Sequence, residues 1–255
     1  MQGLLSKLFG RGEKQPERGL APGDCIYAIG DIHGRADLLA GLLVRIEEHA
    51  AGHASPRLVF LGDYVDRGEQ SREVLEICLA TQRSPRFETV FLRGNHEDAL
   101  LRFLERPEEG GDWLSFGGLA TLMSYGVPGV APSMAPARLA EVAERFRARL
   151  PAGHLDFLEN LELSWQSGGT LFCHAGVSPD LAAEDQAEST LLWGDPEFRA
   201  RPWRDGLRVV HGHYVTSEPE VLPHRIGIDT GAYFSGRLTA LRLEGAEHEL
   251  LDFRG

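Results

Sequence analysis

Residues 57–68 read RLVFLGDYVDRG, an apolar run that leads directly into a cluster of charged side chains. The run is short and rich in Leu, Val and Phe, which is typical of a strand buried on both faces. The same arrangement recurs along the chain, where further apolar runs end at Asp31, Asn95, His174, His213 and Asp229. The repetition predicts several buried strands, each followed by a loop that carries polar side chains.

Helical spacing separates the first of these runs from one another. Leu38, Leu42 and Ile46 recur on one face of a helix, and a second helical stretch follows a candidate N-cap at Ser71. Alternating strands and helices indicate an α/β fold built on a layered sheet. Ligands of such sheets bind where the strands end at their carboxyl edges, and every polar cluster lies at that end.

A single large domain suits the length of the chain. We predict one domain over residues 23–255 of the 255, preceded by a flexible tail over residues 1–22. Residues 98–165 differ from the rest because helical patterns dominate there, with Pro136 suited to a helix start. We interpret this stretch as a mostly helical insertion in the same domain, covering one side of the site.

Composition argues against several classes of protein. The formal net charge of -12 disfavours binding to nucleic acid or to an anionic membrane surface. No run approaches the roughly 18 apolar residues of a membrane span, so we expect no stable membrane insertion. Cys25, Cys78 and Cys173 form no disulfide or zinc-ligand pattern, which indicates a reducing cytoplasm. The oligomeric state is not encoded in any of these features.

The polar clusters contain the side chains that divalent metals bind. Asp31 and His33 lie on one turn and offer a carboxylate and an imidazole, and Asp63 could bridge two cations with its two oxygens. Further donors follow later in the chain, at Asn95, His174 and His213. Two cations about 3.5–4 Å apart activate a water and clamp a phosphoryl group during in-line displacement. Mixed oxygen and nitrogen donors admit manganese, iron or zinc.

Phosphoryl transfer also needs positive charge on the phosphate and a proton for the leaving group. Arg67 is the candidate phosphate contact, since a guanidinium binds phosphate bidentately. His96 is the candidate proton donor and a second substrate contact, and Asp66 would orient it and keep it cationic. We therefore predict a catalytic group of Asp66, Arg67 and His96.

Three motifs occur in a fixed order, GDIHG, GDYVDRG and GNHE, and together they are far more specific than any one alone. With HAGVSP and IDTGAYFSGRLTAL further on, the chain resembles the phosphoprotein phosphatase family of calcineurin-like metallophosphoesterases over roughly residues 24–245. The small bacterial and bacteriophage-type serine/threonine phosphatases are the most similar branch. The resemblance implies an α/β fold, a four-layer αββα sandwich of mixed sheets.

The same resemblance implies two divalent cations, with manganese expected because similar family members commonly use it. It places one cation on Asp31, His33 and Asp63. It places the other on Asp63, Asn95, His174 and His213. It also implies Arg67 as a phosphate contact and the pair Asp66–His96 in protonation of the leaving group.

Two departures from the family pattern bear on the substrate. A second phosphate-binding arginine ordinarily follows a tryptophan in this family, but here Asp195 holds that place. Two alternatives stay open: Arg199, Arg201 or Arg204 replaces it, or the contact is absent. Trp193-Gly194-Asp195 is similar to the symmetrical diadenosine tetraphosphatases. Tyr214 stands where a small polar residue usually follows the last histidine ligand.

The leading hypothesis is a protein phosphatase that acts on phosphoserine or phosphothreonine in a phosphoprotein. The alternative is hydrolysis of a small phosphorylated substrate, diadenosine tetraphosphate or another nucleotide. A non-catalytic binding protein is a third class, and the completeness of the candidate ligand set speaks against it.

Several polar residues have ordinary structural interpretations. His211 shares a strand face with His213, so a role beside the ligands and a role in the core both stay open. We expect His154 to be a structural histidine and Glu97 to be a helix-start residue and not a ligand. Cys173 is interpreted as a small buried residue.

Overall fold

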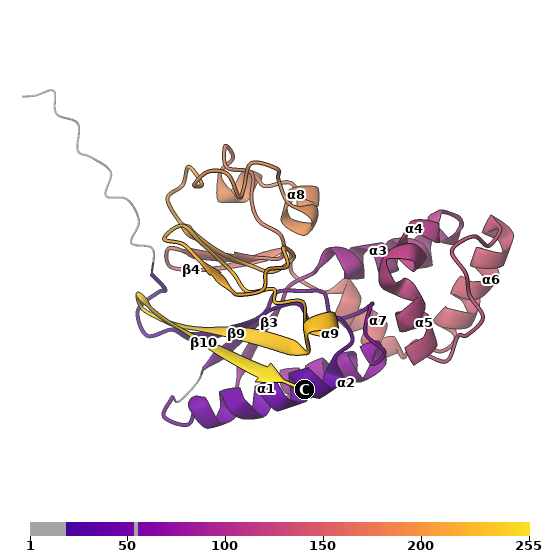
Figure 1. Ribbon diagram of the computed structural model, residues 1–255, viewed down its shortest axis with the longest axis horizontal. Helices are drawn as coiled ribbons and strands as arrows, with labels where there is room; N and C mark the ends of the chain where they lie inside the picture. Colours follow the sequence, from indigo (N-terminus) through magenta and orange to yellow (C-terminus); the bar gives the residue numbers. More distant parts are fainter. Residues whose placement is uncertain (1–18, 54–55) are drawn as a thin grey trace, which may run out of the picture.

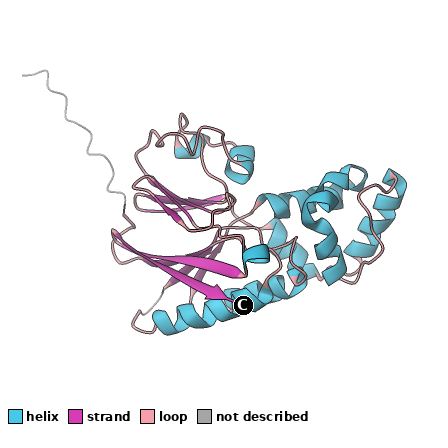
Figure 2. Cartoon of the chain, viewed as in Figure 1, coloured by secondary structure: helices cyan, strands magenta, loops and turns pink. Residues whose placement is uncertain are grey.

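The computed structural model describes residues 19–53 and 56–255, and in these residues two five-stranded sheets pack face to face (Figures 1 and 2). The first sheet has the order β10-β9-β1-β2-β3. Strands β1, β2 and β3 are parallel, whereas β9 is antiparallel to both β1 and β10. Its strands are β1 (Cys25–Ile29), β2 (Arg57–Phe60), β3 (Glu88–Phe91), β9 (Arg237–Glu244) and β10 (Glu247–Arg254).

The second sheet has the order β4-β5-β6-β8-β7 and is also mixed. Strands β5, β6 and β8 are parallel, and antiparallel β4 and β7 form the two edges. Its strands are β4 (Ser164–Ser167), β5 (Thr170–Cys173), β6 (Arg208–His211), β7 (Glu220–Val221) and β8 (Arg225–Gly227).

Alternating side chains of the central strand β1 face two different hydrophobic cores. Ile26 and Ala28 lie between the sheets, against Phe172 and Val210 of the second sheet. Tyr27 and Ile29 point the other way, into the core formed with helices α1 (Ala36–His49) and α2 (Ser71–Gln82). Both faces of β1 are therefore buried, as the unbroken apolar run predicts.

The outer face of the second sheet carries much less helix. Leu171 and Val209 pack there against Leu191 of the short helix α8 (Glu188–Trp193) and against irregular segments that include Trp203. Figure 1 shows α1 and α2 below the first sheet and α8 above the second. The predicted αββα sandwich of mixed sheets is confirmed, with a thin fourth layer.

Residues 98–165 are mostly helical and lie beyond one end of the sheets (Figure 1). One helix begins at Pro136, as predicted, and strand β4 begins at Ser164, so the helical stretch ends at Glu159. Its helices are α3 (Asn95–Glu105), α4 (Gly111–Trp113), α5 (Leu119–Ser124), α6 (Pro136–Arg147) and α7 (Ala152–Glu159), with a π-helical turn (Leu114–Gly118) before α5.

Two local expectations need correction. Ser71 is the first residue of α2 and not its cap, because its hydroxyl accepts the Asp66 amide at 3.1 Å. Residues 1–18 lie outside the described residues, but Leu20, assigned to the flexible tail, is buried between the sheets and donates its amide to Gly245. Its apolar side chain recruits this segment, so the packed body begins before residue 23.

No helix among the described residues is both long enough and apolar enough to cross a membrane.

Candidate metal centre

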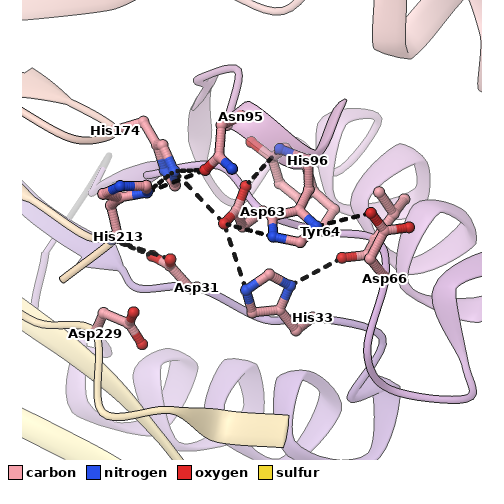
Figure 3. A network of polar contacts seen from close by, with 12 residues as sticks. Asp31, His33, Asp63, Tyr64, Asp66, Asn95, His96, His174, His213 and Asp229 are labelled. Atoms are coloured by element: carbon pink, nitrogen blue, oxygen red, sulfur yellow. Dashed lines mark hydrogen bonds and ion pairs between the residues drawn. The ribbon is translucent and has the colours of Figure 1, made fainter. Parts of the chain in front are cut away.

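The candidate residues of the two sheets meet in one place because the parallel strands end at neighbouring edges. Asp31 and His33 follow β1, Asp63 follows β2, and Asn95 begins α3 shortly after β3. From the second sheet, His174 directly follows β5 and His213 follows β6. Figure 3 shows all six side chains directed toward a common centre.

The backbone of this region is unusual. Among the described residues, the non-glycine residues with positive φ are His33, Asp63, Asp66, Arg67 and His213, with φ between 47° and 71°. A side chain with a Cβ rarely adopts this conformation, and doing so costs about 1 kcal/mol or more. The surrounding structure therefore holds each of these side chains in a place that local preference alone would not select.

Asp63 lies at the centre of the cluster and is 2 % exposed. Its Oδ2 lies 3.4 Å from His33 Nε2, 3.5 Å from His174 Nε2 and 4.0 Å from His96 Nε2. Burial opposes ionisation of Asp63, but the surrounding histidines, His174 first, outweigh it and bring the pKa of Asp63 below its usual value. Asp63 is thus a buried carboxylate with nitrogen donors on more than one side.

A second set of donors converges beside Asp63. Asn95 Oδ1 lies 2.8 Å from His174 Nε2 and 3.0 Å from His213 Nδ1, and the two imidazole nitrogens are 3.2 Å apart. Burial lowers the pKa of His213 to about 3, so this imidazole is neutral and its nitrogen can donate an electron pair. Lone pairs brought so close together repel one another unless a proton or a cation lies between them.

Asp31 enters the cluster from the side of His213. Both of its carboxylate oxygens accept the amide N–H of His213, at 3.2 and 3.0 Å. Asp229, which follows β8, is a buried carboxylate next to it (Figure 3). Burial, and then the negative charges of Asp229 and Asp63, raise the pKa of Asp31 well above its usual range. Three carboxylates buried in one small volume repel one another, and a bound cation would relieve this repulsion.

The histidine tautomers suit a metal as well. His33 Nδ1 donates to the carbonyl of Val65 at 3.0 Å, and His174 Nδ1 donates to the carbonyl of Leu61 at 2.8 Å. With Nδ1 engaged in this way, Nε2 of each ring is directed at Asp63. His33 Nε2 is buried with no hydrogen-bond partner in the described residues, whereas His174 Nε2 also contacts Asn95 Oδ1 and His213 Nδ1. This donor set fits a pair of divalent cations of the manganese, iron or zinc class.

Two of the three groups of potential metal ligands among the described residues contain Asp63, namely His33–Asp63–His96 and Asp63–His174–His213, and within each group the ligand atoms lie within 4.8 Å of one another. The first differs from the sequence assignment, which gives His96 a proton-transfer role and Asp31 the ligand role. Of the three histidine Nε2 atoms near Asp63 Oδ2, that of His96 is the farthest, and the Nδ1 of His96 is already bonded elsewhere.

That bond joins His96 to Asp66. His96 Nδ1 lies 2.7 Å from Asp66 Oδ2, which also accepts Trp113 Nε1–H at 2.8 Å. The Thr121 hydroxyl donates to the other oxygen of Asp66 at 2.6 Å. Burial alone would lower the pKa of His96, but the charge of Asp63 and the bond to Asp66 raise it above its usual value. The pair therefore favours a cationic His96.

Glu97 has a larger structural role than its sequence position indicates. Its Oε2 accepts the amides of Asp63 and Gly94, both at 2.9 Å, and its Oε1 accepts those of Tyr64 at 2.8 Å and Val65 at 3.2 Å. Burial, and then the neighbouring Asp63, raise the pKa of Glu97, whereas the backbone hydrogen bonds from Val65 and Gly94 lower it and favour the carboxylate form. Glu97 lies in the first turn of α3, as expected, and its carboxylate also holds the loop that carries Asp63.

Two arginines stand beside the cluster without an ion pair in the described part of the chain. The Arg67 guanidinium lies 5.0 Å from the centre of the Tyr233 ring, and Arg199 lies 5.2 Å from that of Tyr214. The Tyr214 ring is in turn 4.9 Å from His213. By contrast, Arg201 binds Asp180 and Glu197, and Arg204 binds the carbonyl of Asp180.

Two further histidines, His211 and His154, occupy structural positions. His211 Nδ1 bonds the carbonyl of Gly212 at 2.9 Å, and the ring packs against Phe198. Burial lowers the pKa of His211 to about 4. His154 is buried in helix α7, outside the cluster, and bonds the Tyr125 hydroxyl at 2.7 Å. Neither belongs to the potential ligand groups.

Sequence reasoning gave no role to Asp229, Trp113 or Thr121. Asp229 carries the same signal as the others, a polar cluster at a strand end. Trp113 and Thr121 carry no such signal, because they reach Asp66 only through the packing of the helical stretch onto the loop after β2.

In a comparison with known protein families, residues 26–236 of this chain match the model of the calcineurin-like phosphoesterases. Similar curated proteins include the asymmetrical bis(5'-nucleosyl)-tetraphosphatase PrpE of Anoxybacillus flavithermus, 28% identical over 235 residues, and that of Bacillus thuringiensis, 30% identical over 234 residues. In both cases the match covers 84% of this chain and 88% of the relative.

Among solved structures, similar folds include a protein provisionally described as a diadenosine tetraphosphatase, with a TM-score of 0.62 and 20% identity. That match covers 94% of this chain and 100% of the other. A protein serine/threonine phosphatase from Saccharomyces cerevisiae has a TM-score of 0.56 and 16% identity, covering 94% and 84%. At these identities the structures bear on the fold alone.

Proposed function

This chain belongs to the calcineurin-like phosphoesterase family, and we propose that it hydrolyses phosphate esters or phosphoanhydrides at the centre around Asp63. The observation that carries the proposal is the convergence of His33 Nε2 and His174 Nε2 on the buried Asp63 carboxylate, with His33 Nε2 left without a hydrogen-bond partner in the described residues. These residues come from strands of two different sheets. Such convergence of electron-pair donors has no use in packing.

We assign Asp31, His33 and Asp63 to one divalent cation, and Asp63, Asn95, His174 and His213 to a second. Manganese is the expected metal, with iron or zinc as alternatives. Such a pair of cations supplies hydroxide near neutral pH and neutralises the charge of the phosphoryl oxygens. Asp229, adjacent to Asp31, adds negative charge that strengthens the attraction for cations.

The chain itself supplies the proton that the leaving group needs. In its cationic form His96 carries a transferable proton on Nε2, which is buried and has no hydrogen-bond partner in the described residues. Asp66 holds the opposite nitrogen and favours the cationic form. A leaving oxygen that accepts this proton departs as a neutral alcohol or as a less charged phosphate, and the barrier falls accordingly.

Two guanidinium groups are available for the phosphate. Arg67 follows Asp66 in the chain, and the carbonyl of Gly117 accepts its amide at 3.3 Å. We assign the second phosphate contact, which the sequence left open among three arginines, to Arg199. Its guanidinium has no carboxylate partner in the described residues and lies over Tyr214, the neighbour of His213. Arg201 and Arg204 are already engaged with the Asp180 segment.

For the substrate we rank a bis(5'-nucleosyl) polyphosphate first. The motifs alone favour a protein phosphatase, but the similar curated proteins are named as asymmetrical tetraphosphatases and match most of this chain. The aspartate at position 195, where protein phosphatases carry an arginine, agrees with this ranking. Dephosphorylation of phosphoserine or phosphothreonine is the second candidate, supported by the resemblance of the motifs.

Product analysis tests both candidates at once. We expect the manganese-loaded enzyme to convert diadenosine tetraphosphate to AMP and ATP faster than it releases phosphate from phosphoserine and phosphothreonine peptides. Two molecules of ADP would indicate symmetrical cleavage instead, and faster peptide turnover would restore the protein phosphatase. Asp63→Asn should abolish each activity, whereas His154→Ala should not, and hydrolysis that survives Asp63→Asn would refute the centre.

We propose the cytoplasm as the compartment of this protein, on the state of its cysteines. Cys25, Cys78 and Cys173 are all free and buried, which fits a protein of the reducing cytoplasm.

A further inference from the structure

A cavity of about 260 Å³ opens beside the candidate metal centre, between α3, the π-helical turn before α5, and α8. Four aromatic side chains line it, Phe103, Trp113, Phe116 and Trp193. Its volume lies slightly below the roughly 300 Å³ at which pockets for drug-sized ligands begin, so it suits a single planar ring system. No residue of the cavity belongs to the ligand set or to the catalytic group described above.

Two residues of the cavity wall contact the residues that would act on the leaving group. The Phe116 ring stands edge-on to His96, with the ring centres 4.9 Å apart, and Trp193 stands edge-on to Phe116 at 6.3 Å. Trp113 forms part of the cavity wall and donates to Asp66, the partner of His96. A group that occupies the cavity is therefore attached to the substrate on the side of His96, where the leaving group departs.

The walls have the chemistry that recognises a nucleobase. Trp193 is 45 % exposed although it is a large aromatic residue, so one face of its ring is free to stack. Arg102 and Arg106 add guanidinium groups, which stack on bases or bind further phosphates. Glu109 and Asp112 offer carboxylates that can accept an exocyclic amine. Peptide side chains next to a phosphoserine would use this combination poorly.

We propose that this aromatic cavity binds the nucleobase of the leaving nucleotide, with Trp193 and Phe116 as its stacking surfaces. The inference rests on the proposed function, since it names how a nucleotide substrate would be recognised. It goes beyond that function in giving specificity to residues outside the metal centre. Trp193 and Phe116 would select the substrate that is bound. Asp63 and His96 would carry out its cleavage.

The first test compares two substrates of one reaction type, diadenosine tetraphosphate and inorganic tripolyphosphate, which has no base. In Trp193→Ala the ratio of kcat/KM for the nucleotide to kcat/KM for tripolyphosphate should fall about tenfold, mostly through KM, which corresponds to about 1.4 kcal/mol. Met123→Ala is the matched control, because Met123 is 67 % exposed, lies in the same helical stretch and does not line the cavity. An unchanged ratio in Trp193→Ala, with the nucleotide still cleaved, would overturn the proposal and leave the proposed function standing.

The second test separates the cavity from turnover. Adenosine carries no phosphate, so titration of the manganese-loaded enzyme with adenosine, followed by tryptophan fluorescence, reports on the cavity alone. We expect saturable quenching that weakens at least tenfold in Trp193→Ala and is unaffected by added inorganic phosphate. Binding of adenosine without cleavage of any nucleotide would uphold the cavity and refute the proposed substrate. Absence of saturable binding would refute the cavity.

Discussion

Asp66 is held by hydrogen bonds with four buried side chains, three of them on its carboxylate. His96, Trp113 and Thr121 each contact its carboxylate, and its own amide is bonded to Ser71 and Thr121. Such a fixed carboxylate can orient an imidazole and hold it cationic without reorganisation during the reaction. Its effect should therefore depend on how much the leaving group needs a proton.

We predict that Asp66→Asn lowers kcat/KM for phenyl phosphate by about 100-fold, within the range that general acids contribute. The loss for 4-nitrophenyl phosphate should be much smaller, because its more acidic leaving group departs without protonation. Steady-state kinetics on the two esters measure the difference. Equal losses on both esters would show that Asp66 acts on folding or metal binding and not on proton transfer.

Glu97 shows a different kind of residue-level control. Four buried amides share its two oxygens, and three of them belong to the segment Asp63 to Val65. In Glu97→Gln, an NH2 group replaces one of the two oxygens. It cannot accept a hydrogen bond from the two backbone N–H groups that it would face. We expect a loss of roughly 2 kcal/mol or more in the free energy of unfolding, from buried donors left without acceptors, and weaker binding of manganese.

Urea denaturation and calorimetric titration with manganese check these two effects. Glu105→Gln is the matched control, since Glu105 is exposed at the other end of the same helix. If Glu97→Gln and Glu105→Gln behaved alike in both measurements, the assigned role of Glu97 would be wrong.

Arg199 can be distinguished from its neighbour Arg201 by one substitution each. Arg199→Gln should raise KM for the nucleotide about tenfold, as loss of a charged contact to phosphate would. Arg201→Gln removes only exposed ion pairs, which contribute little, and should leave KM unchanged. Steady-state KM values decide the assignment, and the reverse order of effects would transfer the phosphate contact to Arg201.

At the scale of single residues, the sequence predicted those site residues that stand in a short local motif. Asp31, Asp63, Asn95 and His174 stand at strand ends in recognisable motifs, and the structure brings them together. The contacts of Glu97 could not be foreseen, because its four partners depend on how the loop after β2 folds back over α3. The same holds for Ser71, whose hydroxyl bonds Asp66 and does not cap its helix.

At the scale of elements, the π-helical turn Leu114–Gly118 connects the helical stretch to the catalytic loop. Gly117 has a φ of 146°, and its carbonyl accepts the amide of Arg67. A Cβ built on Gly117 would lie 2.9 Å from Asp66 Cβ and 3.0 Å from the Arg67 backbone nitrogen. Neither the conformation nor the space admits a side chain here.

We predict that Gly117→Ala lowers kcat by roughly ten- to 100-fold, because it displaces Asp66 and Arg67 together and misplaced catalytic groups lose rate at that level. Gly153→Ala is the control, since Gly153 lies in α7 and a Cβ there meets nothing within 4 Å. In the control, kcat should be unchanged and stability slightly improved. Wild-type kcat in a folded Gly117→Ala protein would show that the turn does not position the loop.

Periodicity predicted the elements well where they bury one face. Helices α1 and α6 agree with the spacing of Leu38, Leu42 and Ile46 and with the start at Pro136. The π-helical turn has no such periodicity, since LSFGG combines glycines with an aromatic residue. Its conformation depends on the contacts of Gly117 with another loop, which a local pattern cannot report.

At the scale of the whole molecule, the two sheets were predicted as an αββα sandwich only through the resemblance to a family. Apolar runs identify the strands, but they do not say that β9 pairs with β1 and that β10 forms the edge. The pairing of β9 with β1 joins residues more than 200 positions apart, such as Cys25 and Glu244. The thin fourth layer over the second sheet also escapes a pattern-based prediction, because irregular segments supply much of its core.

Removal of the metal should lower the stability of the whole fold. Asp31, Asp63 and Asp229 are buried together, and cations bound to the native state alone would relieve their repulsion. At manganese concentrations of about 100 times Kd, the gain is about 2.7 kcal/mol, which raises Tm by roughly 5–10 °C in a chain of this size. Thermal denaturation with manganese and after chelation measures the shift.

Asp63→Asn supplies the control for this prediction, and it should show little or no shift. An equal shift in that variant would place the stabilising metal elsewhere, the group Cys25, His53 and Glu244 being the remaining candidate among the described residues.

The left-handed backbone at His33, Asp63, Asp66, Arg67 and His213 has a consequence for the evolution of this chain. Glycine at any of these positions would relax the main chain, so selection for heat resistance alone would enrich such replacements. Each of them would also remove a group assigned here to the reaction. Laboratory evolution under thermal selection, without a requirement for turnover, should therefore drift toward inactive variants whose changes mark the outline of the active centre.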